Sequence, residues 1–356
     1  MAHPLDTLDT YARYDVQDIG YGIEHFPEQF LIAKKEMRSF VIPVTYKKIT
    51  RVVLVGMGGS HLGMDVIRAC AIGSLKKPVD IVSDYMLPGY VNYQTLVILS
   101  SFSGTTEEVL EVARRAEKAR AKICVLTSGG DLARMAQRKK WPLYQFIPGE
   151  LAVQPRLGIG FSFVGFLHVL KSCGVLTVSV AQVDAMIDAM VDVIDTCALE
   201  ISLKENPAKQ VAQALKNAPV LIVAAEHLAG NAIVLQNQLQ ETAKVYAHVE
   251  LLPEMNHHFL EGLSLPKAFF AQWSVLMLCS THYHARTQKR LKITADILEK
   301  QGGHIVEYMA NGASVWEEIS EVLQFGMYAS YYQAMLHEVK PEEIPFVKTL
   351  KEKMKK

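Results

Sequence analysis

The sequence predicts an α/β protein in which parallel β-sheets are covered by helices. Apolar runs typical of buried strands alternate with amphipathic helical patterns along the whole chain. This alternation restarts after residue 203, so the chain carries the pattern twice, without close sequence identity between the copies. A chain of 356 residues has room for two domains. We expect an N-terminal domain over residues 1–176 and a C-terminal domain over residues 177–356.

The first half of the chain contains five strand patterns separated by helical ones. We expect strands at residues 51–56, 79–83, 96–100, 123–127 and 143–147. We expect helices at residues 61–71 and 107–120, from residue 132 onward, and at 155–170.

The second half begins with an amphipathic helical segment, residues 178–203, which we expect to bridge the two halves. Residues 271–279 read equally well as a buried strand or a buried helix, and we expect a strand. The other predicted strands lie at residues 219–225, 245–249 and 305–309, and the predicted helices at 227–240, 285–300, 315–335 and 342–356.

Charge and cysteine content limit the class of protein. The 37 basic residues equal the 37 acidic ones, which disfavours general binding to nucleic acid or to a membrane surface. We expect no membrane-spanning helix, because no apolar run reaches roughly 18 residues. The polar, acidic residues 1–18 do not resemble a signal peptide. The five cysteines lack metal or redox spacing and predict reduced core residues of a cytoplasmic protein, with a catalytic thiol as the alternative.

A loop rich in hydroxyl groups, residues 101–106, follows one of the predicted strands and precedes a helix. Its sequence is Ser-Phe-Ser-Gly-Thr-Thr. A helix N-terminus offers free N–H groups and partial positive charge, and the added hydroxyls favour binding of a phosphate group. The loop has no lysine, so it is not a Walker-type nucleotide loop. The alternative is that these hydroxyls only cap the helix.

A glycine-rich turn, residues 56–60, follows the first predicted strand of the chain. Its glycines would let the backbone approach a ligand closely, or would serve only tight packing. It is not a dinucleotide-binding fingerprint, since His61 stands where the last glycine is required. Both loops follow the carboxyl ends of predicted parallel strands, which is where open α/β sheets bind ligands.

Together, Gly-x-Gly-Gly-Ser and, about 40 residues later, Ser-x-Ser-Gly-x-Thr resemble the sugar isomerase (SIS) domain. The resemblance implies that these loops hold a sugar phosphate. SIS domains also occur in regulators that only sense phosphosugars, so the pair of motifs does not by itself indicate an enzyme. The implied substrate-binding residues are Gly58, Gly59, Ser60, Ser101, Ser103 and Thr106.

Four further segments resemble the bifunctional phosphoglucose/phosphomannose isomerases, which carry two tandem SIS domains. They are residues 155–158, 241–244, 253–257 and 350–351, and the resemblance extends from about residue 50 to the end of the chain. The resemblance implies a C-terminal helix and four catalytic residues. These are the base Glu241, the ring-opening His257, the active-site Arg156 and a C-terminal lysine, Lys351, for which Lys348 is the alternative.

Isomerisation chemistry agrees with these assignments. Moving a proton between C2 and C1 of a sugar needs one carboxylate base, and Glu241 would supply it. His257 and Lys351 could open the sugar ring, while Arg156 would stabilise the enediolate. We expect neither a metal nor another cofactor. Taken singly, each of these residues is more often a surface charge or a turn residue.

The predicted activity is aldose–ketose isomerisation of glucose 6-phosphate and fructose 6-phosphate. Use of mannose 6-phosphate is in question, because Ile344 stands where the family often has threonine. The alternatives are a non-catalytic phosphosugar sensor and an SIS enzyme acting on an amino-sugar phosphate.

The resemblance also implies a homodimer in which His257 reaches the active site of the opposite subunit. Apolar surface for the dimer interface could come from Phe269, Phe270, Trp273 and the aromatic-rich residues 325–332. The alternative is a two-domain monomer that buries the same residues between its halves.

Overall fold

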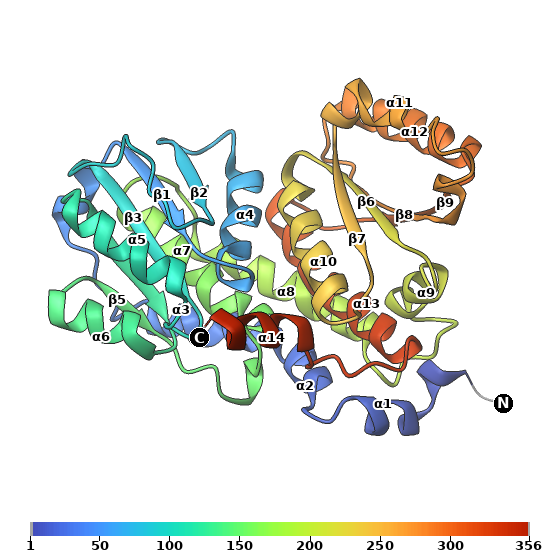
Figure 1. Cartoon of the computed structure of the whole chain (residues 1–356), viewed down its shortest axis with the longest axis horizontal. Helices are drawn as coiled ribbons and strands as arrows, with labels where there is room; N and C mark the ends of the chain where they lie inside the picture. The colour runs from blue at the N-terminus through green and yellow to red at the C-terminus, as the bar shows by residue number, and fades with distance from the viewer. Residues whose placement is uncertain (1–2, 355–356) are drawn as a thin grey trace.

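The computed structural model describes residues 3–354 and contains two parallel β-sheets (Figure 1). The first sheet has the order β2-β1-β3-β4-β5 and the second has the order β7-β6-β8-β9. The strands of the first sheet are β1 Arg51–Val55, β2 Val79–Val82, β3 Thr95–Ser101, β4 Lys122–Thr127 and β5 Leu143–Gln145. Those of the second are β6 Val220–Ala225, β7 Ala247–Leu252, β8 Ser274–Cys279 and β9 His304–Met309.

The helices cover both sheets and include three N-terminal ones that the sequence patterns did not predict. In the first half they are α1 Leu8–Tyr14, α2 Ile19–Glu24, α3 Phe26–Glu36, α4 Gly59–Ala71, α5 Glu107–Lys118, α6 Gly130–Lys139 and α7 Ile159–Ser172. In the second half they are α8 Val180–Cys197, α9 Pro207–Ala214, α10 Ala229–Glu241, α11 Phe259–Gly262, α12 Ala285–Lys300, α13 Val315–Leu336 and α14 Pro345–Met354.

The nine predicted strands are confirmed, with ends shifted by a few residues, and residues 271–279 contain strand β8. The predicted helix over residues 155–170 is instead a short 3-10 turn, Pro155–Leu157, followed by α7. The bridging helix α8 ends earlier than expected, at Cys197, and α9 follows it. Of the predicted tail helix, residues 355 and 356 lie outside the described part of the chain.

The central strands β3, β6 and β8 are buried along their whole length. Helices on both faces of a parallel sheet exclude water from both sides, which explains their continuous apolar sequences. Helices α4 and α10 pack against each other between the two sheets (Figure 1). The loop before α4 and the end of α10 therefore approach the same region of the molecule.

Helix α13 forms the centre of the second half and packs against α8, α9 and α10. Its aromatic residues are almost fully buried, with exposed fractions of 0% for Phe325 and Tyr328 and 1% for Tyr331. The expectation that residues 325–332 are available for a partner subunit was therefore wrong. Phe270 is also buried, whereas Phe269 is half exposed.

The N-terminal helices tie the two halves together. Tyr11 of α1 stacks on Tyr331 of α13, and the Gln324 amide donates a hydrogen bond to the Ile23 carbonyl. The predicted domain boundary between residues 176 and 177 places one sheet before it and the other after it, and it stays a prediction. Within the described residues, no helix combines the length and the apolar character needed to cross a membrane.

The five cysteines are free, four of them are buried, and Cys70 is half-buried. Burial raises the pKa of the Cys70 thiol to about 12 and that of Cys173 to about 11. Thiols with raised pKa values are poor nucleophiles, so the interpretation of these residues as core cysteines is favoured over a catalytic thiol.

Candidate active site

The glycine-rich turn and the hydroxyl loop meet at the carboxyl ends of β1 and β3, which are neighbours in the sheet. The Phe102 backbone N–H donates to the Ser60 hydroxyl at 3.0 Å, and the Ser100 hydroxyl donates to the Ser60 carbonyl at 2.6 Å. This is the topological switch point of the sheet, since β2 lies on one side of β1 and β3 on the other. Two of the predicted motifs therefore form one site.

Glycine is required where the loops approach their neighbours most closely. A Cβ at Gly59 would lie 2.8 Å from the Pro155 carbonyl carbon and 2.9 Å from the Arg156 nitrogen. Gly104 has a φ of +66°, and a Cβ there would lie 1.8 Å from the Gly129 carbonyl oxygen. The missing side chain of Gly59 thus lets the backbone of Arg156 lie directly against the glycine-rich turn.

The hydroxyls of residues 101–106 form two pairs, of which one is partly buried and the other is exposed. The Ser101 side chain is buried, and its hydroxyl lies 2.8 Å from that of Thr106. Ser103 and Thr105 are exposed and their hydroxyls lie 3.0 Å apart. Thr106 stands at the N-cap position of α5 but makes no side-chain capping bond, so the first-turn N–H groups have no cap. Thr105, which the sequence analysis did not select, is therefore as well placed for an anion as Ser103.

Arg156 joins the first domain to the end of helix α10. Its side chain is 1% exposed, and Nη1 lies 3.3 Å from Oε2 of Glu241. Nε donates to the Thr242 hydroxyl at 3.0 Å, and Nη2 donates to the Pro341 carbonyl at 2.5 Å. Burial lowers the pKa of the guanidinium, and the Glu241 carboxylate opposes that change. The carboxylate itself remains 30% exposed, so it is accessible to a substrate.

Lys244 is a further member of this cluster, and it lies in the segment 241–244 that carries the family resemblance. Its ammonium group donates to the carbonyls of Thr242, Lys340 and Pro341. Although the residue as a whole is exposed, the burial of its ammonium group, followed by repulsion from Arg156, lowers the pKa of Lys244 to about 8. These contacts hold the segment before α14 against the end of α10.

Glu342 lies in the same segment and is only 7% exposed. Its Oε2 atom has no hydrogen-bond partner among the described residues. Its carboxylate acts electrostatically on both Arg156 and Lys244, opposing the lowering of their pKa values. Ile344, two residues further on, is half-buried at the start of α14.

His257 does not lie near Glu241 in the same chain. Glu241 ends α10 before strand β7, whereas His257 ends the 3-10 turn that follows this strand. The six residues of β7 span about 20 Å, so the two side chains lie at opposite ends of the second domain. Lys351 and Lys348 are both exposed on α14, which crosses the front of the molecule between the halves (Figure 1).

The corresponding position in the second sheet carries different residues. Its switch point lies between β6 and β8, and His227 and His282 follow these strands. Both histidines contact the buried carboxylate of Glu318, at 2.5 Å and 3.0 Å. No group of three or more His, Cys, Asp or Glu side chains suited to a metal ion occurs in residues 3–354.

The fold and this site are those expected of two tandem SIS domains. Residues 204–354 match the family described as the bacterial phospho-glucose isomerase C-terminal SIS domain. A solved structure of a hypothetical protein from Thermus thermophilus shares the fold, with a TM-score of 0.73, 18% identity, and coverage of 98% of this chain and 92% of that one.

Two curated relatives are bifunctional phosphoglucose/phosphomannose isomerases. The protein from Caldicellulosiruptor bescii is 29% identical over 337 residues, covering 94% of this chain and 98% of the relative. The protein from Aquifex aeolicus is 28% identical over 306 residues, covering 86% and 90%. The resemblance predicted from the motifs is therefore confirmed over nearly the whole chain.

Proposed function

We propose that this protein is an aldose–ketose isomerase that interconverts glucose 6-phosphate and fructose 6-phosphate. The observation that supports the proposal is the position of Arg156: its backbone lies against the glycine-rich turn, and its side chain contacts the Glu241 carboxylate of the second domain. A phosphosugar sensor would need the loops but would not need this carboxylate. The relatives' names favour an isomerase over the sensor.

Glu241 acts as the base in the proposed reaction. It removes the proton from C2 of the open-chain aldose as the carbonyl oxygen at C1 gains the electron pair and a proton, which gives a cis-enediol. Return of the proton to C1, with loss of the proton from the C2 hydroxyl, gives the ketose. Arg156 stabilises the negative charge on the enediolate oxygens, and such preorganised donors commonly contribute about 10²–10³ in rate.

The phosphate group of the substrate binds at the hydroxyl loop in this proposal. Ser103, Thr105 and Thr106 would donate from their hydroxyls, and the first turn of α5 from its backbone N–H groups. The buried Ser60 joins the two loops through the Phe102 N–H, and the buried Ser101 braces its own loop through the Gly104 N–H, so both have structural contacts in place of the ligand. Gly58, where a Cβ would meet no atom within 4 Å, would allow the sugar to approach the backbone, whereas Gly59 makes room for Arg156.

Ring opening requires groups from two subunits. Because His257 lies at the far end of β7 from Glu241, we propose that it serves the active site of a second copy in a homodimer. Lys351 would act from α14 with His257 as the acid–base pair at the ring oxygen. Helix α14 also presents an exposed apolar stripe, with Phe346 90% and Leu350 61% exposed, which a partner subunit could cover.

Complementation tests the shared site. Inactive Glu241→Gln and His257→Ala chains are mixed under conditions of subunit exchange, which is confirmed independently by mass spectrometry of the heterodimer. If each site draws on both chains, random pairing restores up to about a quarter of the full activity, because half of the dimers then carry one intact site of two. No recovery would mean that His257 serves its own chain.

A coupled assay with fructose 6-phosphate tests the activity itself, with glucose 6-phosphate and mannose 6-phosphate measured separately. We expect glucose 6-phosphate to form, also after exhaustive treatment with EDTA, and mannose 6-phosphate to form more slowly because of Ile344. Activity lost to EDTA and restored by zinc would indicate a metal-dependent isomerase.

We also propose that the protein is located in the cytoplasm. The free cysteines support this location, because disulfides are rare in that compartment.

A further inference from the structure

The two sheets differ at one edge. In the first sheet β5 pairs with the outer edge of β4. The second sheet ends at β9, and no strand within residues 3–354 pairs with its outer edge. The four strands of the second sheet therefore correspond to the first four strands of the first sheet, and β5 has no counterpart among the described residues.

Strand β9 is the counterpart of β4 residue by residue. β4 pairs with β3 from Leu96↔Lys122 to Ser101↔Thr127, and β9 pairs with β8 from Ser274↔His304 to Cys279↔Met309. Both registers run over six pairs, so Val125 of β4 corresponds to Glu307 of β9, and Thr127 corresponds to Met309.

The backbone groups that bind β5 in the first sheet are unpaired by any strand in the second. The Val125 N–H donates to the Pro142 carbonyl at 2.9 Å, and the Thr127 carbonyl accepts from the Phe146 N–H at 3.1 Å. In β9 the alternate residues His304 and Ala310 donate inward to β8 and its flank. The intervening Glu307 and Met309 therefore direct their N–H and C=O groups outward. Among the described residues, the Asn311 side chain donates a hydrogen bond to this edge, at the Met309 carbonyl and 3.0 Å.

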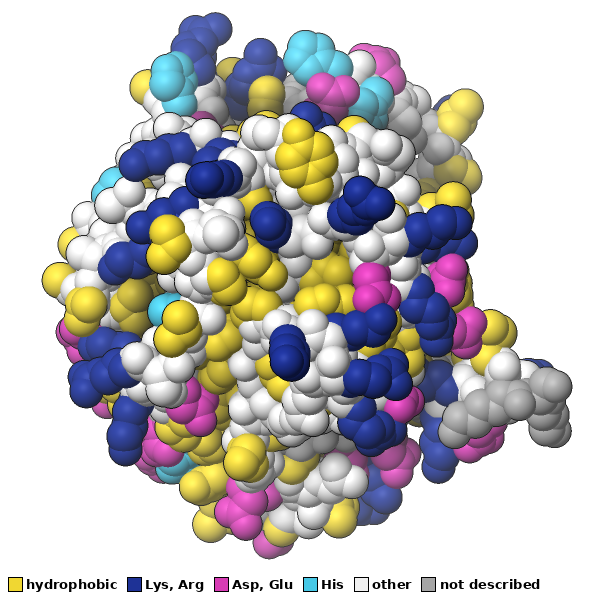
Figure 2. Space-filling model, turned by 90° about the vertical axis from the view of Figure 1, so that its left-hand side faces the viewer, with side chains coloured by type: hydrophobic (Ala, Val, Ile, Leu, Met, Phe, Trp, Pro, Cys, Tyr) yellow, Lys and Arg dark blue, Asp and Glu magenta, His cyan; other side chains and the backbone are white. Residues whose placement is uncertain are grey.

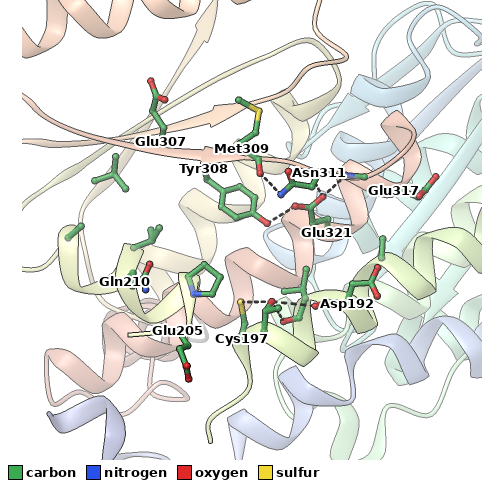
Figure 3. Close-up of a pocket in the computed structure, with 18 of the residues that line it drawn as sticks. Asp192, Cys197, Glu205, Gln210, Glu307, Tyr308, Met309, Asn311, Glu317 and Glu321 are labelled. Atoms are coloured by element: carbon green, nitrogen blue, oxygen red, sulfur yellow. Dashed lines mark hydrogen bonds between the residues drawn. The ribbon is translucent and has the colours of Figure 1, made fainter. Parts of the chain in front are cut away.

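A cavity of about 1000 Å³ lies along this free edge. Figure 3 shows β9 on one side of the cavity, with side chains from α8, from the region of α9 and from the start of α13 around it. In the first domain, β5 occupies the matching edge with Tyr144, which is buried and donates to Glu36 of α3. We name the cavity in the second domain the strand slot.

The strand slot is acidic. No lysine, arginine or histidine is found among the described residues that line it. Glu321 is occupied, because it accepts from the Tyr308 hydroxyl and from the N–H groups of Asn311 and Gly312. Glu317 is also engaged, because its two carboxylate oxygens accept from the Ala313 N–H and the Ser314 hydroxyl. The remaining lining carboxylates each keep at least one oxygen without a hydrogen bond among the described residues: Asp192, Glu205 and Glu307.

This local excess of acid contrasts with a chain that has equal numbers of acidic and basic residues. On the side of the first domain that carries β5 and α6, lysine and arginine side chains are spread widely over the surface (Figure 2). A ligand that fits both the unpaired backbone edge and the acidic lining must be extended and positively charged.

We propose that the strand slot binds an extended, basic peptide segment of a partner protein as a fifth, parallel strand of the second sheet. The backbone groups of Glu307 and Met309 make the main-chain hydrogen bonds, as Val125 and Thr127 do for β5. Asp192, Glu205 and Glu307 bind lysine or arginine side chains of the segment. Strand addition of this kind takes affinity from the main chain and specificity from alternate side chains.

A synthetic peptide tests the proposal with the full-length protein. The probe is fluorescein-labelled Lys-Leu-Tyr-Lys-Phe-Lys-Lys, which follows the apolar pattern of β5 with added lysines, and binding is measured by fluorescence anisotropy. We expect saturable binding with a Kd below roughly 1 mM at low salt. In hydrogen exchange, the bound peptide should slow exchange at the amides of Glu307 and Met309. Absence of saturable binding would overturn the proposal.

Two peptide controls separate strand addition from simple charge attraction. A peptide of the same sequence with alternate N-methylated residues cannot form the ladder, and we expect no saturable binding of it. Spermidine carries charge without a backbone, and we expect it to displace the probe only at far higher concentration. If the N-methylated peptide binds as well as the parent, or if spermidine displaces the probe as efficiently as unlabelled peptide, the slot binds cations and not strands.

Variants of the chain complete the test. Glu307→Lys reverses the charge of an exposed edge residue and should weaken binding by about tenfold or more. The matched control Glu299→Lys, on the exposed face of α12, should change the Kd by less than about twofold. Met309→Pro removes an outward N–H at an edge position where proline is tolerated, and it should also weaken binding. Equal affinity of wild type and Glu307→Lys would contradict the proposed site.

Discussion

The two switch points of this molecule have the same topology and opposite contents. Between β1 and β3 the chain places glycines and small hydroxyl residues, and Ser103 and Thr105 are exposed. Between β6 and β8 it places large polar side chains that bind one another. The first switch point can therefore receive a ligand, whereas the second is filled by the protein itself.

The second switch point centres on Glu318, which has 0% exposure. Its carboxylate accepts from the Ser280 hydroxyl at 2.6 Å and contacts His227 and His282. Burial alone would raise the pKa of Glu318, but hydrogen bonds from His227, Ser280 and His282 hold it below its ordinary value. A carboxylate so fully engaged stabilises the fold and offers little to a sugar.

The difference between the two switch points indicates how two domains of the same fold can contribute to one candidate active site. The second domain does not repeat the glycine-rich turn and the hydroxyl loop at its own switch point. It contributes instead through the end of α10, where Glu241, Thr242 and Lys244 contact Arg156 or the segment before α14. In our proposal one domain holds the phosphate and the other supplies the base.

Among substitutions that test the difference between the two switch points, Arg156→Met should have the largest effect on kcat. The change leaves Thr242 and the Pro341 carbonyl without their buried donor and removes the partner of Glu241. We expect kcat to fall by about 10²–10³, as for loss of a transition-state donor. The free energy of unfolding should fall by about 3 kcal/mol, the low end for breaking a buried pair, since Glu241 remains partly solvated.

Arg115→Met is the matched control, because Arg115 pairs with Glu111 on the surface and is 42% exposed. Its loss should change stability by less than about 1 kcal/mol and leave kcat unchanged. Activity assays and urea unfolding measure both variants. A normal kcat for Arg156→Met would remove Arg156 from the proposed mechanism.

Glu318→Gln should affect stability and spare substrate binding. Breaking its contacts with two histidines in a buried site should lower the free energy of unfolding by about 3 kcal/mol or more. The KM for fructose 6-phosphate should stay within about twofold of wild type if the second switch point binds no substrate. A large rise in KM without loss of stability would place a ligand there.

The same group predicts a dependence on acid. The folded-state pKa of Glu318 lies below its ordinary value of 4.5. Its stabilisation is therefore present above pH 4.5 and lost as the pH falls through the folded-state pKa. In urea titrations, Glu318→Gln should lose less stability than wild type as the pH falls below 4.5. Equal losses would show that Glu318 is not linked to acid unfolding.

Hydroxyl deletions compare the two switch points directly. Each hydrogen bond to a charged phosphate contributes about 1.5–3 kcal/mol, so Ser103→Ala or Thr106→Ala should weaken substrate binding by about tenfold or more. Thr105→Ala should act similarly, since its hydroxyl is exposed in the same loop. Ser280→Ala is the control in the second domain, and calorimetry should find its substrate affinity unchanged. Unchanged substrate affinity in all three loop variants would mean that these hydroxyls do not bind the phosphate and only cap helix α5.

The smallest effect is expected from the titration of Lys244, whose pKa is lowered to about 8. Above that pH the neutral amine loses its charge-assisted bonds to the carbonyls near α14, so activity should decline a few-fold. Stability should instead rise slightly between pH 8 and 10.5, because the unfolded chain binds the extra proton there. The solvent exposure of Lys244 keeps both effects small.

Lys244→Arg keeps a positive charge at this position, so the decline of kcat at alkaline pH should move to higher pH. Lys340→Arg serves as the control, because Lys340 pairs only with the exposed Glu343 among the described residues. The pH profiles of kcat are the measurement. An unchanged profile for Lys244→Arg would mean that another group sets the alkaline limb.

The sequence allowed the strands and the position of both loops at the first switch point to be predicted, because continuous apolar runs and loop glycines are local signals. It did not predict α1 to α3. Helices α1 and α2 pack on α13 and join residues about 300 positions apart, as in the bond from Gln324 to Ile23, whereas α3 packs on α7. The buried state of the aromatic α13 was likewise set by neighbours that no local pattern identifies.

The candidate site was likewise predictable only where a local motif marks its residues. Arg156 and Glu241 came from motif resemblance, and the structure places them in contact. Lys244 and Glu342 were missed, because their environment comes from a fold that brings residues 340–342 back to α10. His257 and Lys351 stay predictions, since their proposed partners lie across a dimer.

The central claim, that Glu241 is the base at the single working switch point, is tested most directly by isotope exchange. Glu241→Gln and wild type are incubated with fructose 6-phosphate in heavy water, deuterium incorporation is followed by NMR, and substrate affinity is measured by calorimetry. Our account predicts that the variant binds substrate within a few-fold of wild type but incorporates no deuterium at the exchanging carbon. Deuterium incorporation by Glu241→Gln at a rate near that of wild type would contradict it.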